Sequence, residues 1–154
     1  MPRGRGYPLL KLKKMEKLLK SSCISLGITI MDNAHKLLTR ELVAILQSPD
    51  CEFTRRFQRF CHLLEQSFQQ EENLMEEISY YDIRAHREQH AALLSALHRT
   101  IPRSMDGDYF FARQILTLLP QWFLAHLIKM DATLIKALET AGAQPIAKTL
   151  SVVL

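Results

Sequence analysis

Apolar side chains recur every three or four residues along most of the chain, which is the spacing of α-helices with one buried face. This periodicity predicts helices at about residues 30–47, 53–78, 83–99 and 109–140. Segments rich in Pro, Asp, Ser or Gly separate these helices, and strand-type alternation is not found. Because the connections are short, neighbouring helices should be antiparallel. The pattern therefore predicts an all-α, up-down-up-down four-helix bundle with an extra basic N-terminal segment.

Residues that start, stop or bend helices refine these boundaries. Asp82 is expected to be the N-cap of the third helix, and Pro102 should lie just beyond its end. The segment Asp106-Gly107-Asp108 should cap the fourth helix, which Pro120 is expected to bend and Gly142 to end.

Charge divides the chain into three parts. The net charge of the 154 residues is +4, but residues 1–20 hold seven Lys or Arg and one Glu, so the rest is slightly acidic. We expect a basic arm at 1–22, a bundle at 23–142 and a C-terminal tail at 143–154. Within the arm, a helix face made of Leu12, Met15 and Leu19 would pack against the bundle. Weak association of residues 1–20 with an anionic membrane surface stays open as an alternative, and no nucleic-acid partner is expected.

The cysteines and the apolar runs indicate a cytoplasmic protein. Cys23, Cys51 and Cys61 are odd in number and form no C-x-x-C pair, so free thiols that serve as small packing residues are expected. Lysines interrupt the apolar residues of the arm, which excludes a secretory signal peptide. No apolar run approaches the ~18 residues of a membrane-spanning helix. The oligomeric state is not defined by these features.

Histidines and carboxylates at particular spacings are the candidate chemistry. His86 and His90 stand four residues apart, so they project side by side from one helix face and can bind one metal ion. The alternative is an exposed pair of polar residues, but flanking Ile83, Leu93 and Leu94 place the pair near the core. A buried histidine needs a partner for each ring nitrogen, and a metal ion supplies one.

His126 and Asp131 form a second unit in an apolar surround. Five residues correspond to about 140° around an α-helix, so these side chains converge only if metal ions lie between them and Asp131 reaches round. A buried Asp requires a partner or a metal ion. The alternative is that Asp131 faces solvent beside Lys129 and Lys136.

Two further candidate ligands fall on apolar helix faces. Glu71 shares a stripe with Phe68 and Met75, which suggests a carboxylate that bridges two metal ions. His35 falls on the same face as Leu38 and Leu42. His62 and His98 are rotated away from these faces and are expected to be surface or rim histidines.

Four segments together resemble the hemerythrin family in its short, single-domain bacterial form. Residues 27–38 resemble G-I-x-x-I-D-x-Q-H-x-x-L, and 68–75 resemble F-x-x-E-E-x-L-M. Residues 80–90 resemble Y-P-x-x-x-x-H-x-x-x-H, and 122–131 resemble W-L-x-x-H-I-x-x-x-D. The four segments follow in the family's order and spacing over about residues 27–135.

The resemblance implies a bundle that holds two non-heme iron ions joined by an oxo or hydroxo bridge. One iron would take His86, His90 and His126, with Glu71 and Asp131 bridging to the other. The second iron would take His35 and a histidine that the family places four residues before the bridging Glu. That position is Ser67 here, so the second iron is expected to be weakly held, partial or absent. Ala34 and Tyr81 also depart from the family's Gln and Pro.

The resemblance and its departures leave three functions in competition. The first is a non-enzymatic protein that binds dioxygen, or another diatomic or peroxide ligand, for storage or sensing. The second is a di-iron enzyme that reduces peroxide or nitric oxide at an iron opened by Ser67. The third is a degenerate mono-metal protein that acts through partner contacts. The retained candidate ligands and their apolar surround favour the first.

Overall fold

The computed structural model describes residues 13, 17 and 27–142. The predicted helix face of the basic arm, Cys23 and the tail at 143–154 lie outside the described residues.

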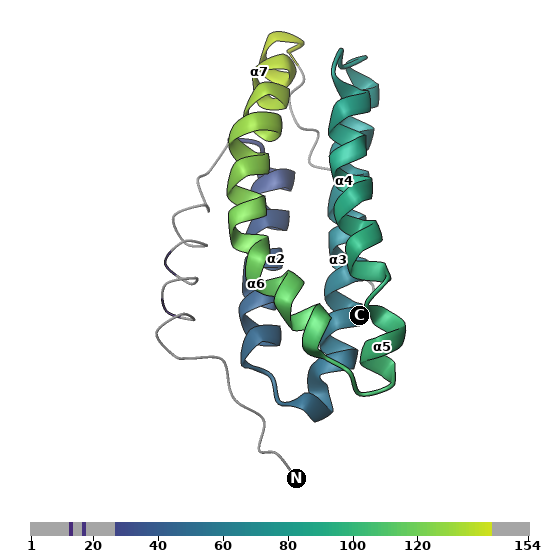
Figure 1. Cartoon of the computed structure of the whole chain (residues 1–154). Coiled ribbons are helices and arrows are strands. Elements are labelled where there is room, and N and C mark those ends of the chain that lie inside the picture. Colours follow the sequence, from purple (N-terminus) through teal and green to yellow (C-terminus); the bar gives the residue numbers. More distant parts are fainter. Residues whose placement is uncertain (1–12, 14–16, 18–26, 143–154) are drawn as a thin grey trace, which may run out of the picture.

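The described chain is an all-α bundle, as the sequence pattern predicted (Figure 1). Helix α2 packs against α3 and α6, and α4 packs against the same two helices, so the long helices enclose one core. The fourth helical segment is divided, because a π-helical turn, η1, interrupts it between α6 and α7. The elements of the four helical segments are α2 (Thr29–Gln47), α3 (Asp50–Glu77), α4 (Ile83–His98) and, in the divided fourth segment, α6 (Phe110–His126), η1 (Leu127–Asp131) and α7 (Ala132–Thr140).

A short helix that the apolar pattern did not predict, α5 (Ile101–Met105), joins α4 to α6. Pro102 stands at the start of α5 rather than in a loop beyond α4. This position suits proline, because the first residues of a helix have no intrahelical use for their backbone N–H groups.

Two predicted caps differ in their details. Asp82 is the N-cap residue of α4, but its side chain makes no capping hydrogen bond. The N-cap of α6 is Tyr109, and the side chain of Asp108 accepts a hydrogen bond from the backbone N–H of Phe110 (3.2 Å). Gly107 and Gly142 both have positive φ, and Gly142 follows the end of α7 as expected for a C-terminal signal.

The turn between α3 and α4 sets the position of the following helix. Ser79 adopts a left-handed conformation (φ 50°) just after the end of α3. The backbone N–H of Tyr80 donates to the carbonyl of Met75 (2.8 Å), and that of Ser79 donates to Glu76 (3.0 Å). This pair of bonds is a Schellman motif, which ends α3 sharply and returns the chain alongside it.

The core consists of two apolar layers separated by a polar layer. The layer near α5 holds Leu38, Leu42, Ile45, Leu46, Phe53, Phe57, Phe60, Cys61, Leu64, Phe68, Leu93, Leu97, Ala112, Leu116 and Leu119. The layer near α7 holds Ile28, Met31, Met75, Tyr80, Leu134, Ile135 and Leu138. Between them along each long helix lie His35, Glu71, His86, His90, His126 and Asp131. The bundle therefore keeps its polar side chains in one slab that apolar side chains cover on both sides.

The cysteines differ from expectation in one case. Cys51 and Cys61 are both free, and Cys61 is buried in the core as a small packing residue. Burial is the main reason why the pKa of Cys61 rises to about 12, so its thiol stays protonated. Cys51 is exposed, so the prediction that it is a packing residue was wrong. Within the described residues, no helix is long and apolar enough to cross a membrane.

Candidate metal centre

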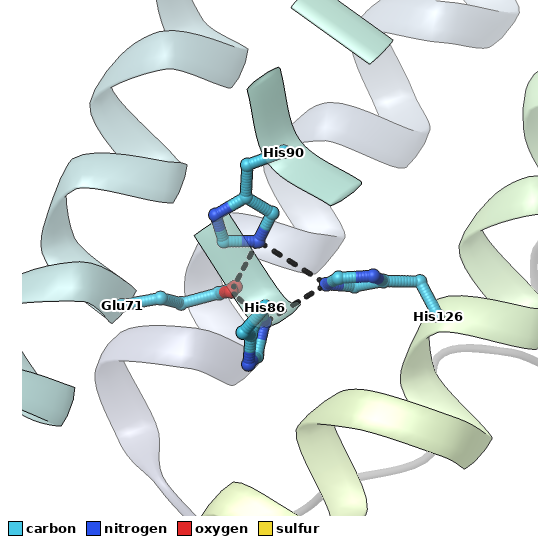
Figure 2. A group of neighbouring side chains, drawn as sticks. All are labelled: Glu71, His86, His90 and His126. Atoms are coloured by element: carbon cyan, nitrogen blue, oxygen red, sulfur yellow. Dashed lines mark hydrogen bonds and ion pairs between the residues drawn. The ribbon is translucent and has the colours of Figure 1, made fainter. Parts of the chain in front are cut away.

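Three buried imidazoles meet one carboxylate in the polar layer (Figure 2). Nε2 of His126 lies 3.0 Å from Nε2 of His86 and 3.2 Å from Nε2 of His90. Oε2 of Glu71 lies 3.2 Å from Nε2 of His90 and 3.5 Å from Nε2 of His86. The donors come from α3, α4 and α6, and all four side chains point toward one centre.

A second group adjoins the first and shares its carboxylates. Nε2 of His35 lies 3.6 Å from Oε1 of Glu71 and 3.5 Å from Oδ2 of Asp131. The other oxygen of Asp131, Oδ1, lies 3.3 Å from Nε2 of His86 and 3.2 Å from Nε2 of His126. Each carboxylate therefore presents one oxygen to His35 and the other oxygen to the three-histidine group.

The π-helical turn η1 brings His126 and Asp131 to the same side of their helix. The backbone N–H of Ala132 donates to the carbonyl of Leu127, which is a five-residue step. A turn of this width places residues five apart on one line, and such turns often occur at functional sites. The expectation that Asp131 must reach round the helix holds only for a regular α-helix, so it was wrong for this segment.

Burial decides the open alternatives about these residues. Asp131 is 2% exposed, so it does not face solvent. His86 and His90 are also buried and are not an exposed polar pair. His62 and His98 are largely exposed and both contact Glu65, in agreement with their prediction as surface histidines.

Aromatic rings cover two of the imidazoles. The ring of Phe68 stacks on His90 with centroids 3.7 Å apart and an interplanar angle of 4°. Trp122 stacks on His126 with centroids 4.6 Å apart and an angle of 11°. These contacts fix the ring planes and keep water from one face of each imidazole.

Sequence reasoning missed the partners of the outer ring nitrogens, which are the Nδ1 atoms that face away from the centre. Nδ1 of His90 donates to Oε1 of Glu72 (3.1 Å), and Nδ1 of His126 donates to Oε1 of Gln89 (2.9 Å). Both bonds leave an unprotonated Nε2 facing the centre. The signal was the antiparallel pairing of α3 with α4, which places Glu72 beside the helix that carries His90.

The pKa values of the buried groups indicate an electrostatic environment that favours bound cations. Burial alone would lower the pKa of His86, but Asp131 and Glu71 outweigh it and raise this pKa to about 9. The pKa of His35 is also raised: burial opposes the rise, and Glu71 and Asp131 outweigh burial. Burial raises the pKa of Glu71, but the surrounding imidazoles bring it well below its ordinary value. The Glu71 carboxylate therefore remains charged and attracts positive charge to the buried centre.

The donor set fits a metal ion on two grounds. Ligands ~2.1 Å from one ion and at right angles to each other lie roughly 3 Å apart, which agrees with the observed separations of 3.0 to 3.5 Å. Buried polar atoms ordinarily have partners. Among the described residues, the buried side-chain atoms without a hydrogen-bond partner are Ser67 Oγ, Glu71 Oε2, His86 Nδ1 and Asp131 Oδ1. Two of these four atoms are carboxylate oxygens that face the centre.

Ser67 lies at the edge of the second group. Its side chain is 5% exposed and adjoins a cavity of about 30 Å³. The lining of this cavity includes the polar residues His35, Glu71 and Asp131 and the apolar residues Leu38, Phe68 and Phe123. Ser67 thus lies one helical turn before Glu71 and lines the same cavity as His35.

The bundle encloses a buried cluster of histidines and carboxylates that could hold a metal ion. The chain is 28% identical over 111 residues to the bacteriohemerythrin of Ralstonia nicotianae, a match that covers 72% of this chain and 81% of that protein. This similarity supports a hemerythrin-like family. No protein-family model and no solved structure matches the chain.

Proposed function

We propose that this chain is a non-heme di-iron protein that binds dioxygen, or another diatomic or peroxide ligand, for storage or sensing. The observation that carries this proposal is the division of each carboxylate between two histidine groups. Glu71 and Asp131 each direct one oxygen toward His35 and one toward the three-histidine group. A carboxylate in this position bridges two metal ions.

In this proposal, His86, His90 and His126 would hold one iron and His35 would hold the other. Glu71 and Asp131, which contact both histidine groups, would supply carboxylate oxygens to both irons. Iron, when bound, supplies reversible electron transfer to a small oxygen ligand. The carboxylates of Glu71 and Asp131 would partly balance the charge of two cations, and neutral imidazoles would supply lone pairs, so that a buried site tolerates the ions.

The cavity beside Ser67 is the proposed position of the small ligand. A cavity needs about 10–15 Å³ to hold a water molecule, so about 30 Å³ is suited to a ligand of two heavy atoms. Leu38, Phe68 and Phe123 give the cavity an apolar part of its lining, which disfavours bulk water there. Exclusion of water protects a bound oxygen ligand from proton transfer and premature loss.

Catalytic reduction of peroxide or nitric oxide is the second candidate, because Ser67 leaves more room beside His35. Within the part of the chain that the structure describes, the buried hydroxyl of Ser67 has no hydrogen-bond partner, and Ser67 lines the cavity. A reductase also needs a proton donor. Apart from the proposed ligands, the polar side chains that line the cavity within the described part of the chain are Thr39 and Ser67. Neither hydroxyl is an effective acid near neutral pH, so we favour ligand binding over reduction.

A degenerate mono-metal protein is the third candidate. The second group contains one imidazole, His35, so its affinity for iron should be lower than that of the three-histidine group. The carboxylates of Glu71 and Asp131 compensate in part for this lower affinity, since each also contacts His35 in the second group.

The test is to load the full chain with ferrous iron without oxygen, count iron per chain and record visible spectra before and after adding oxygen. Two irons and a visible band that bleaches on deoxygenation would support the proposal. Turnover of peroxide or nitric oxide would favour the reductase. One iron or none per chain would favour the degenerate protein.

A further inference from the structure

The three imidazoles of the larger group differ in what their outer nitrogens contact. His90 donates to the carboxylate of Glu72, and His126 donates to the neutral amide of Gln89. Nδ1 of His86 is buried and has no hydrogen-bond partner among the residues that the structure describes. Nδ1 therefore contacts a charged group in His90, a neutral group in His126 and no described group in His86. The Nε2 atoms of all three imidazoles nevertheless face the same centre.

Surface residues hold the carboxylate of Glu72 in place. Oε1 of Glu72 accepts from His90, and Oε2 accepts from Nε of Arg87 (3.0 Å). Arg87 also donates to Glu76, one turn further along α3. Hydrogen bonds to these two glutamates, with burial opposing, raise the pKa of Arg87, so the guanidinium remains charged. The side chain of Glu72 is 20% exposed, so this chain of contacts runs from a buried imidazole to the surface.

We propose that Glu72, oriented by Arg87, is a positioning residue that makes His90 the strongest of the three imidazole donors and favours the oxidised state of the metal bound there. This inference rests on the function proposed above. Its basis is the ionic hydrogen bond at Nδ1 of His90, which neither His86 nor His126 has.

The physical reason is the transfer of electron density through the imidazole. A carboxylate that accepts the Nδ1 proton fixes the tautomer with Nε2 unprotonated and raises the basicity of that nitrogen. A more basic ligand stabilises the higher charge of an oxidised metal more than the lower charge of a reduced one. Glu72 therefore lowers the reduction potential, whereas the amide of Gln89 fixes the tautomer of His126 without adding charge.

A reciprocal pair of variants separates this role from a structural one. Glu72→Gln keeps an acceptor oxygen and removes the charge, whereas Gln89→Glu adds a charge at His126. Glu77→Gln is the matched control, because Glu77 is exposed on the same helix and its substitution makes the same change in charge. We would measure the midpoint potential of the iron-loaded full chain and the affinity of the metal-free chain for zinc by competition with a chelator.

We expect Glu72→Gln to raise the midpoint potential and to weaken zinc binding roughly 10- to 100-fold. Gln89→Glu should lower the potential, and Glu77→Gln should change neither quantity. Equal shifts in Glu72→Gln and Glu77→Gln, or shifts of the same sign in Glu72→Gln and Gln89→Glu, would overturn the inference.

The two proposals fail in different ways. If the wild-type chain binds no iron or zinc, the proposed function is wrong and this inference is overturned with it. If the wild-type chain binds two irons and the variants match the control, only the role of Glu72 is overturned. Circular dichroism of each metal-free variant checks its folding, and Gln89→Glu carries the test if Glu72→Gln does not fold.

Discussion

Nε2 of His126 lies 3.2 Å from Oδ1 of Asp131, although the two residues stand five positions apart on one helical segment. A regular α-helix would rotate the second side chain by about 140° relative to the first. The π-helical turn between them reduces this rotation. The backbone irregularity therefore positions a proposed bridging carboxylate against a proposed histidine ligand.

Asp131→Asn should weaken metal binding by at least about 10-fold, because it removes a buried charge that both histidine groups contact. An amide of the same size keeps the packing, so the metal-free bundle should still fold. Zinc titration monitored by calorimetry measures the affinity, and Asp106→Asn, at an exposed turn, is the control. Equal affinities in the two variants would contradict a ligand role for Asp131.

His90→Ala should release most of the metal and lower the melting temperature of the metal-loaded protein. Binding of a metal to the native state alone adds to the free energy of unfolding, so loss of a ligand reduces both quantities. Metal per chain and thermal melting should be compared with those of His98→Ala, which removes an exposed imidazole that contacts Glu65. Unchanged metal content in His90→Ala would show that His90 is not a ligand.

Helical periodicity was sufficient to predict the bundle, because each long helix has one continuous apolar face. Phe53, Phe57, Phe60 and Leu64 are all fully buried on α3, as the stripe indicated. Periodicity did not predict α5, since five residues are too few to show a repeat. It also did not predict η1, because a single wide turn changes the register without changing the residue types around it.

The candidate ligands were found because a His, Asp or Glu on an apolar face is an unusual residue that needs an explanation. Their outer partners were not found, since Glu72 and Gln89 lie on partly exposed faces where polar residues are common. The contact of Glu72 with His90 depends on the packing of α3 against α4, and an apolar pattern does not specify that register to within one residue.

Metal binding and metal-free stability should respond to pH in opposite directions. In the folded metal-free protein the pKa of His86 is about 9, against 6.5 for a free imidazole, because Asp131 and Glu71 outweigh the effect of burial. Protonation of His86 therefore stabilises the folded state fully below about pH 6.5, and this contribution is lost as pH rises to about 9.

A metal ion competes with that proton, so zinc affinity should rise over the same interval and binding at pH 7 should release protons. Thermal melting of the metal-free protein at pH 6 and pH 9, and zinc titration in two buffers of different ionisation enthalpy, measure the two effects. His86→Gln is the control that should remove much of the pH dependence of melting. A melting temperature that is not lower at pH 9 than at pH 6 would contradict the prediction.

Removal of residues 1–20 should leave metal binding unchanged. The proposed ligands lie between His35 and Asp131, and the arm supplies none of them. A chain that starts at Ser21 should bind the same amount of iron as the full chain, measured by metal analysis after identical loading. Loss of iron in the shorter chain would show that the arm contributes to the site.

Ser67→His should strengthen the second metal position. The new imidazole would stand one turn before Glu71 on the same helix face, next to the cavity of about 30 Å³ that His35 and Asp131 also line. It would give the second group a second imidazole, so iron per chain should rise toward two and any oxygenated form should persist longer. Ser67→Ala is the control, because it removes the hydroxyl without adding a ligand. Iron analysis and the decay of the visible band measure both effects. A wild-type chain that already holds two irons and a long-lived oxygen adduct would show that Ser67 does not weaken the site.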